Sequence, residues 1–202
     1  MRLGIFGGTF DPVHFGHLLL AESAREQLRL DEVWFIPAAT PPHKRDRELT
    51  PAKQRLEMLE LGIAGNEAFR VSTLELDRGG VSYTADTLRQ ILQQHPDAKL
   101  FLLMGADSLR DLVTWREPEE VCRLAVPAVV RRGGQPDLDF SVLQPLVTPE
   151  RLETIRASEV AISAVDFSST DLRERAANGR SLRYRTPRAV EKFIETQKLY
   201  RA

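Results

Sequence analysis

The stretch that most constrains how this chain can fold covers residues 4–17, where an apolar run passes through two glycines into a helix-forming segment. The apolar run ends at Gly7 and Gly8, so the pattern predicts a buried strand joined to a helix that begins near Phe15 or Gly16. Glycines allow a loop backbone to approach a ligand, and a helix start directs unpaired N–H groups and the positive end of its dipole into the same space. We therefore expect this stretch to bind an anion such as a phosphate group.

Two histidines, His14 and His17, lie at the start of the predicted helix, three residues apart. At this spacing their rings share one face of the first turn, where each can donate a hydrogen bond. The unperturbed pKa of about 6.5 also allows a charged ring near neutral pH, and such donors suit charge that develops on a phosphoryl group during transfer. A single histidine is more often a packed residue, and a pair can also bind zinc. Catalytic zinc takes three protein ligands, and neither His43 nor His95 lies in a motif that supplies the third.

Strand-like runs alternate with helix-like segments, which predicts an α/β fold with a doubly wound, Rossmann-like parallel sheet and helices on both faces. After the first strand, these runs cover residues 33–36, 69–76, 99–104, 124–130 and 159–163. The run at 99–104 is the most apolar and is expected beside the first strand at the switch point, where ligands bind beyond the strand ends. Gly105 and Asp107 would then face the first glycine loop, where Asp107 can bind a ribose hydroxyl or a metal, or only cap the next helix.

The first two strands exclude two other nucleotide-binding folds. A dinucleotide-binding dehydrogenase needs G-x-G-x-x-G in the first turn and an acidic residue near the end of the second strand. This chain has Gly-Gly-Thr-Phe-Asp-Pro at residues 7–12, and its second strand ends in Pro37-Ala38-Ala39. The phosphate loop G-x-x-x-x-G-K-[ST] is also absent from the sequence, so both folds are set aside.

The composition is that of a soluble enzyme without a broad charged surface. Of 202 residues, 42% are hydrophobic, and 28 basic against 29 acidic residues give a formal net charge of −1, which argues against nucleic acid as the main partner. The single cysteine, Cys122, cannot form an intramolecular disulfide, and no apolar run is long enough to span a bilayer. We expect a cytoplasmic protein that does not bind membranes.

Two later helices are predicted from their start signals. Thr50 and Pro51 predict a helix with Thr50 as its cap and Pro51 at the first helical position. Its apolar stripe is formed by Ala52, Leu56, Leu59 and Ile63. The polar loop before it holds Lys44, Arg45 and Arg47, which can reach a substrate phosphate or form only a solvated surface. Thr84 is expected to cap a further helix.

A second helix start with anion-binding groups lies near residue 170. Ser168, Ser169 and Thr170 open a predicted helix that Asn178-Gly179 ends, and Arg173 lies within its first turn or so. Free N–H groups, hydroxyls and an arginine that binds phosphate oxygens in a forked geometry make this a candidate phosphate site. The same residues can also serve only as a well-formed cap.

Residues 7–17, Gly-Gly-Thr-Phe-Asp-Pro-Val-His-Phe-Gly-His, resemble the signature of the nucleotidylyltransferases that carry an H-x-G-H motif, and most closely the bacterial nicotinate mononucleotide adenylyltransferases. H-x-G-H alone marks only the superfamily, whereas the longer form is much more specific. Further matches, in the family's order, cover residues 42–44, 82–88, 105–115 and 166–173. Phe167 and Leu172 replace two isoleucines of the last motif, which should affect packing and leave its polar groups alone. The resemblance implies a single nucleotidylyltransferase domain over residues 1–202.

The resemblance, together with the residue patterns, assigns expected roles to particular residues. Those expected to act in catalysis are His14, His17 and Arg173. Those expected to bind ATP are Gly7, Gly8, Thr9, Phe10, Gly105, Asp107, Ser168, Ser169, Thr170 and Arg173. Those expected to bind the mononucleotide are His43, Lys44, Tyr83, Thr84 and Trp115, with the tryptophan against the pyridine ring.

The implied reaction is attack by the phosphate of nicotinate mononucleotide on the α-phosphate of ATP, which releases pyrophosphate and forms the deamido precursor of NAD. A Mg²⁺ ion held largely by the triphosphate is expected to assist. Three alternatives stay open at this point: a relative that modifies another phosphate, a nucleotide-binding module without turnover, and a zinc hydrolase. The sequence also leaves open whether the chain forms a homo-oligomer.

Overall fold

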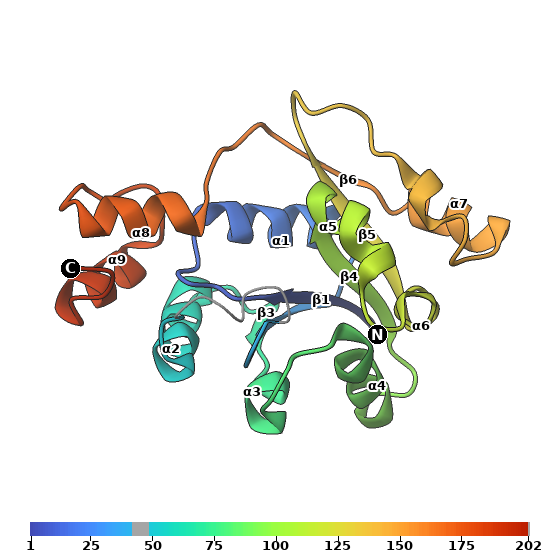
Figure 1. The fold of residues 1–202 in the computed structure, drawn as a ribbon, viewed down its shortest axis with the longest axis horizontal. Helices are drawn as coiled ribbons and strands as arrows, with labels where there is room; N and C mark the ends of the chain where they lie inside the picture. Colours follow the sequence, from blue (N-terminus) through green and yellow to red (C-terminus); the bar gives the residue numbers. More distant parts are fainter. Residues whose placement is uncertain (42–48, 202) are drawn as a thin grey trace.

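The computed structural model describes residues 1–41 and 49–201, and within them six parallel strands form one sheet (Figure 1). The strand order is β3-β2-β1-β4-β5-β6, which confirms the doubly wound α/β sheet predicted from the sequence. The strands are β1 (Arg2–Gly8), β2 (Glu32–Pro37), β3 (Phe69–Val71), β4 (Lys99–Gly105), β5 (Ala125–Arg132) and β6 (Val160–Ile162).

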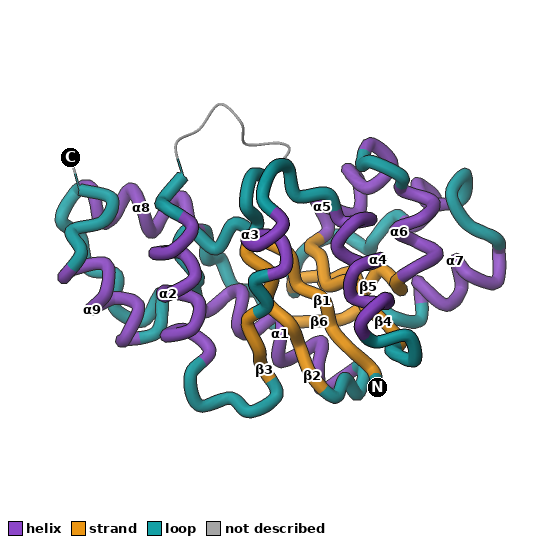
Figure 2. Tube along the Cα trace, turned by 90° about the horizontal axis from the view of Figure 1, so that it is seen from below, coloured by secondary structure: helices purple, strands orange, loops and turns teal. Residues whose placement is uncertain are grey.

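Helices lie on both sides of this sheet, with α1 above the strands in Figure 1 and α3 and α4 below them. The α-helices of the described residues are α1 (Phe15–Gln27), α2 (Ala52–Ile63), α3 (Leu74–Arg78), α4 (Thr84–Gln94), α5 (Ala106–Asp111), α6 (Pro118–Leu124), α7 (Pro149–Arg156), α8 (Ser169–Ala177) and α9 (Arg188–Thr196), with 3-10 turns η1 (Leu112–Thr114) and η2 (Phe140–Leu143). None of the helices in the described part of the chain is both long and apolar enough to cross a membrane. Helices α2, α8 and α9 gather at one end of the molecule in both views (Figures 1 and 2), beyond the carboxyl end of β1.

The centre of the sheet is the β1–β4 pair, as the apolar run at 99–104 predicts. Leu3 of β1 pairs with Leu100 of β4, and Ile5 pairs with Leu102. Continued by three residues, this register brings Gly8 level with Gly105 at the carboxyl ends of the two strands. All six strands contribute side chains to one cluster of buried apolar residues, so a single core supports this edge of the sheet.

The third strand is shorter than the sequence predicts, because the prediction of a strand through Leu76 is wrong. Pairing with β2 ends at Val71, and the N–H group of Ser72 then donates to the carbonyl oxygen of Phe35 at 2.9 Å. The chain turns directly into α3. Because β3 lies at the edge of the sheet, it has only one neighbouring strand, and the helix supplies the backbone hydrogen bonds that a longer strand would lack.

Both predicted helix starts are one residue off. Pro51 has an extended ψ of 138° and occupies the N-cap of α2 rather than its first helical position. Tyr83 is the N-cap of α4, and Thr84 is already helical, so the prediction that Thr84 caps this helix is wrong. The difference matters for function because the first-turn N–H groups of α4 begin at Thr84.

The buried face of α2 also differs from the predicted apolar stripe. Met58 and Leu59 are fully buried, but the largest buried side chain of the helix is that of Arg55, which is only 1% exposed. Its guanidinium donates to the carbonyl oxygens of Thr50 and Thr9, each at 2.9 Å. The predicted stripe residues Ala52, Leu56 and Ile63 are only half-buried. The carbonyl oxygens of Thr50 and Thr9 compensate for the cost of burying the Arg55 guanidinium. A pattern of apolar residues in the sequence does not reveal such a buried arginine.

Candidate active site

The candidate site lies where β1 ends and α1 begins, as predicted. After Gly8 the backbone reverses at Phe10, whose φ is +49°, and α1 starts at Phe15. A Cβ atom at Gly8 would lie 2.9 Å from the Phe10 ring, so only glycine allows this ring to fold back beneath the loop. A Cβ at Gly7 would meet nothing within 4 Å, which leaves its backbone open to a ligand.

The two histidines form a stacked pair at the start of α1, with His14 at the N-cap and His17 in the first turn. Their ring centroids are 3.7 Å apart, with an angle of 19° between the planes. The backbone N–H of His14 donates to Nδ1 of His17 at 3.2 Å, so this nitrogen accepts a hydrogen bond. In the neutral ring the proton then lies on Nε2, and His17 is a donor through that atom. The two rings lie side by side, as expected, although His14 is the N-cap and only His17 belongs to the first turn.

His14 is the more deeply buried of the pair, with only 4% of its surface exposed. Burial, and to a smaller extent the charge of Arg132, lower its pKa from 6.5 to about 4, so the ring is neutral near pH 7. Within the described residues, its Nδ1 is a buried nitrogen without a hydrogen-bond partner. The charged form that the sequence allowed for both histidines is therefore unfavourable for His14 in the folded protein.

Aromatic side chains hold the His17 ring in place. Phe10 packs edge-on against His17 with centroids 5.1 Å apart, and Phe6 lies 5.9 Å away. Phe35 packs against both phenylalanines from β2. Phe10 as a whole is only 2% exposed, so this residue forms part of the packed support beneath the loop.

The start of α8 packs against the segment after β1, although the two are separated by about 160 residues in the sequence. The Ser169 hydroxyl donates to the carbonyl oxygen of Pro12 at 2.9 Å, and Ser168 caps the helix by accepting from the N–H of Asp171 at 3.1 Å. A Cβ at Gly16 would lie 3.2 Å from Cβ of Phe167, so glycine permits the close approach. The two predicted anion sites thus form one region.

Arg173 lies at the junction of these two helix starts. One terminal nitrogen of its guanidinium donates to the carbonyl oxygen of Asp11 at 2.6 Å, and the other donates to the Thr170 hydroxyl at 2.9 Å. The side chain therefore links α8 to the segment that precedes His14. Thr9 of the first loop is held separately, because its carbonyl oxygen accepts a hydrogen bond from Arg55.

The residues expected around the pyridine ring come together from two segments. Arg116 lies over the Tyr83 ring at 4.6 Å and reaches Asp86 at 3.5 Å, which brings the segment after η1 against the start of α4. Trp115, at the end of η1, is half-buried against the core, and Thr84 opens α4. His43 and Lys44, expected at the mononucleotide phosphate, lie outside the residues that the structure describes.

Gly105 lies at the end of β4, beside the carboxyl end of β1, as expected. A Cβ there would meet nothing within 4 Å, so its backbone is accessible. Asp107 is the second residue of α5, not a cap, and its exposed carboxylate pairs with Arg110 one turn later. Its position at the ligand end of the sheet agrees with the expectation, and a ligand would have to compete with Arg110.

Comparisons with known proteins identify the family. The sequence matches the cytidylyltransferase-like family over residues 5–175. A Thermus thermophilus protein named probable nicotinate-nucleotide adenylyltransferase is 47% identical over 203 residues, which cover 100% of each chain. The chain belongs to the nicotinate-nucleotide adenylyltransferase family. A Rhodopirellula baltica protein of the same name is 43% identical over 199 residues, covering 98% of this chain and 93% of its own.

The fold of this nicotinate-nucleotide adenylyltransferase family member also agrees with a solved structure. Plasmodium falciparum nicotinic acid mononucleotide adenylyltransferase, complexed with NaAD, matches it with a TM-score of 0.75 over 98% of this chain and 97% of that chain. At 18% sequence identity, this likeness concerns the fold alone. The family membership confirms the resemblance drawn from residues 7–17.

Three residues around the site were not expected from the sequence: Arg55, Arg132 and Tyr200. Arg55 and Tyr200 reach the segment between Gly8 and His14 from α2 and from the chain after α9. Arg132 ends β5 and acts electrostatically on His14. For Arg132 a signal existed, because a basic residue at the carboxyl end of a parallel strand lies on the ligand side of the sheet.

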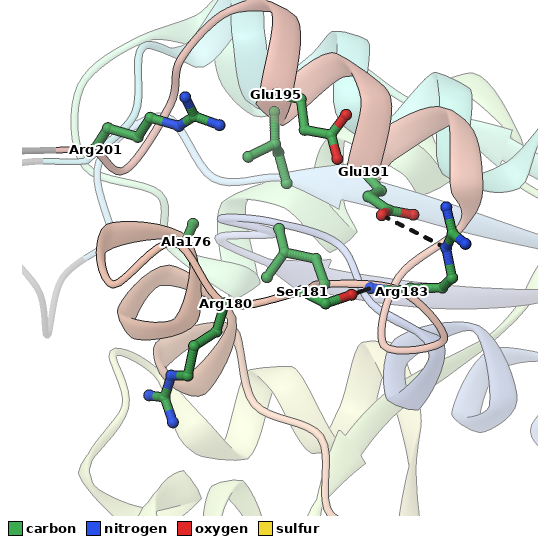
Figure 3. Close-up of a pocket in the computed structure, with 10 residues that line it drawn as sticks. Ala176, Arg180, Ser181, Arg183, Glu191, Glu195 and Arg201 are labelled. Atoms are coloured by element: carbon green, nitrogen blue, oxygen red, sulfur yellow. Dashed lines mark hydrogen bonds and ion pairs between the residues drawn. The ribbon is translucent and has the colours of Figure 1, made fainter.

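Within the described residues, no group of three histidine, cysteine or acidic side chains is arranged to hold a metal ion. A cavity of about 380 Å³ lies elsewhere, between the end of α8, the loop after it and α9 (Figure 3). Glu191 lines this cavity and is paired with Arg183 at 4.0 Å and Arg188 at 2.6 Å. Its lining includes none of the residues expected to bind substrates.

Proposed function

We propose that this protein transfers the adenylyl group of ATP to nicotinate mononucleotide, giving nicotinate adenine dinucleotide (deamido-NAD) and pyrophosphate in NAD biosynthesis. The observation that carries this proposal is the stacked histidine pair at the start of α1, at the carboxyl end of the central strand. Family membership over the full chain supports the choice of substrates, since the relatives are named for this activity. We treat residues 1–202 as one nucleotidylyltransferase domain.

In the proposed reaction a phosphate oxygen of the mononucleotide attacks the α-phosphorus of ATP. One P–O bond forms, the bond from the α-phosphorus to the bridging oxygen breaks, and pyrophosphate leaves with that electron pair. His17 donates from Nε2 to an α-phosphate oxygen, where negative charge is redistributed in the transition state. His14, neutral and packed on His17, fixes the orientation of that ring.

ATP is proposed to lie between the two helix starts. The backbone of Gly7, Gly8, Thr9 and Phe10 and the carboxyl end of β4 at Gly105 and Asp107 would border its nucleoside and α-phosphate. The start of α8, with Ser168, Ser169, Thr170 and Arg173, would bind the β- and γ-phosphates. Arg132 adds positive charge to this region, which supports binding of a triphosphate.

Mg²⁺ is proposed to enter with ATP. The described residues offer no carboxylate cluster, which fits an ion held mainly by phosphate oxygens and water. When bound, such an ion would neutralise charge on the triphosphate and on the departing pyrophosphate. The protein groups that face it would be those of α8, which orient the triphosphate.

Specificity for the acid over the amide is assigned to the start of α4. Backbone N–H groups at a helix start favour the nicotinate carboxylate, an acceptor-only group, whereas an amide would present donors to donors. Tyr83 and Thr84 bring these groups to the site, and Trp115 would stack on the pyridine ring of either substrate. His43 and Lys44 are proposed to bind the mononucleotide phosphate.

The test is a substrate matrix with the purified full chain. ATP or CTP is combined with nicotinate mononucleotide, nicotinamide mononucleotide or no acceptor, in Mg²⁺, and pyrophosphate release is followed. The proposal expects the highest kcat/KM for ATP with nicotinate mononucleotide. Turnover with CTP, equal use of both mononucleotides, or binding without turnover would each reject it in favour of a different family activity.

The cellular setting is part of the proposal. Cys122 is the single cysteine of the chain and cannot form an intramolecular disulfide, which supports a cytoplasmic location; burial raises the pKa of its thiol to about 11, so it is an unreactive packed group. The expected partners are the small-molecule substrates, with no nucleic acid and no membrane. Whether the chain associates into a homo-oligomer stays open, and sedimentation velocity tests it.

A further inference from the structure

The segment Thr9–Val13 joins the glycine loop to His14 and is held mainly by side chains from elsewhere. Four of its five carbonyl oxygens accept hydrogen bonds from side chains outside the segment: Arg55 to Thr9 at 2.9 Å, Arg173 to Asp11 at 2.6 Å, Ser169 to Pro12 at 2.9 Å, and Thr186 to Val13 at 2.7 Å. The donors come from α2, α8 and the turn before α9. The position of His14 and His17 therefore depends on residues far away in the sequence.

One side chain of this segment, Asp11, points into the protein. It is 3% exposed, and one carboxylate oxygen accepts from the Tyr200 hydroxyl at 2.7 Å while the other accepts from the Thr50 N–H at 3.4 Å. Arg55 is 1% exposed, and its positive charge acts on the same region. A buried carboxylate is costly unless it is paired and hydrogen-bonded, so these donors hold the segment in one arrangement.

Tyr200 reaches Asp11 from the chain after α9, and its backbone lies in the left-handed region with φ of +61°. Its hydroxyl lies 3.9 Å from the sulfur of Met58, so the ring is packed between α2 and the Asp11 side chain. Burial and the neighbouring Asp11 raise its pKa well above the usual range, and the hydroxyl therefore remains a proton donor at any working pH. A tyrosine rarely adopts this backbone conformation, which indicates that tertiary contacts determine it.

We propose that Tyr200, acting through the Asp11 carboxylate, and Arg55, acting through the Thr9 carbonyl, are positioning residues for adenylyl transfer. Neither touches a substrate. Together they fix the segment Thr9–Val13 and so set where the His17 ring stands relative to the α-phosphate. The inference rests on the proposed function for its kinetic test, and a separate measurement on the histidines tests it without substrate.

The kinetic test uses Tyr200→Phe, which removes one oxygen and keeps the ring. Small errors in the placement of catalytic groups reduce rate more than binding, and we expect kcat to fall about tenfold while KM for each substrate changes less than about twofold. The matched control is Tyr184→Phe, because Tyr184 is 81% exposed and has no place in the network. An unchanged kcat in Tyr200→Phe, or a raised KM with native kcat, would overturn the proposal.

A double-mutant cycle tests whether Tyr200 acts through Asp11. If it does, Tyr200→Phe combined with Asp11→Ala has the same kcat as Asp11→Ala alone, because Asp11→Ala has already removed the acceptor of the Tyr200 hydrogen bond. Multiplicative losses would mean that Tyr200 acts by another route. Arg55→Lys keeps the charge and is expected to lose kcat as well, since its one nitrogen cannot occupy both positions from which Nε and Nη1 of the arginine donate to Thr50 and Thr9.

The measurement without substrate is NMR of the histidine ring signals. Ring-current shifts depend on the stacking of His14 on His17 and on the Phe10 ring beneath them. Tyr200→Phe is expected to move the His14 and His17 signals, and Tyr184→Phe is expected to leave them in place. If the native protein lacks turnover, the proposed function fails, while these signals still decide the positioning role. Unmoved signals in Tyr200→Phe would overturn it.

Discussion

The buried neutral state of His14 predicts a measurable dependence of stability on pH. Its pKa is about 6.5 in the unfolded chain and about 4 in the folded protein, chiefly through burial and secondarily through Arg132. As the pH falls through this window, the unfolded chain takes up the proton first, so the free energy of unfolding decreases. The loss amounts to about 2 kcal/mol between pH 7 and pH 5, and to about 3 kcal/mol once the folded form is protonated as well.

The assay compares urea unfolding of the native protein and His14→Gln at several pH values across this range. The variant lacks the titrating group, so it should lose about 2 kcal/mol less than the native protein between pH 7 and pH 5. The free energy of unfolding of each protein is compared with its own value at pH 7, which removes the effect of altered packing. The contributions of the other titrating groups cancel in the difference between the two proteins. If the free energy of unfolding fell equally with pH in both proteins, His14 would take up a proton equally well in the folded and the unfolded state. The reasoning from burial would then be refuted.

Three further changes separate the roles assigned to the site. Arg173→Ala should raise KM for ATP more than KM for the mononucleotide in steady-state kinetics. The reverse pattern would mean that the start of α8 binds the mononucleotide and not ATP. Trp115→Ala should lower kcat/KM for nicotinate and nicotinamide mononucleotides alike and leave their ratio nearly intact, whereas a changed ratio would assign specificity to the indole ring. Thr186→Val removes the buried donor to the Val13 carbonyl, 2.7 Å away, and should lower the free energy of unfolding by about 1–3 kcal/mol in urea titrations. Thr186→Ser retains the hydroxyl donor, so its free energy of unfolding should fall less than that of Thr186→Val.

The sheet order and the start of α1 could be predicted because their signals are local. An apolar run, two glycines and a helix-forming segment specify the turn after β1, and the apolar run at 99–104 predicts the central β4. His14 lies at the N-cap and His17 three residues later in the first turn, a spacing that brings the two rings together. The end of β3 was not predictable in the same way, because the chain leaves the sheet for α3 after Val71 although its partner β2 runs on to Pro37.

The support of the site could not be predicted because it depends on contacts between distant segments. Arg55 lies in a helix whose pattern suggests an apolar face, and its buried guanidinium is tolerable only because Thr9 and Thr50 supply carbonyl oxygens in the folded chain. Tyr200 meets Asp11 across 189 positions of sequence. Neither contact has a local signature, whereas the groups expected to meet the substrates lie in local motifs.

The central claim is that the histidine pair promotes transfer of the adenylyl group, and labelled ATP tests it most directly. With label on the α-phosphate, the native protein should place all of it in the dinucleotide, and with label on the γ-phosphate all of it should leave in pyrophosphate. His17→Ala should give the same distribution at a rate lower by about 10²–10³. Release of the α-label as a free nucleotide or phosphate, or a native rate in His17→Ala, would contradict the account.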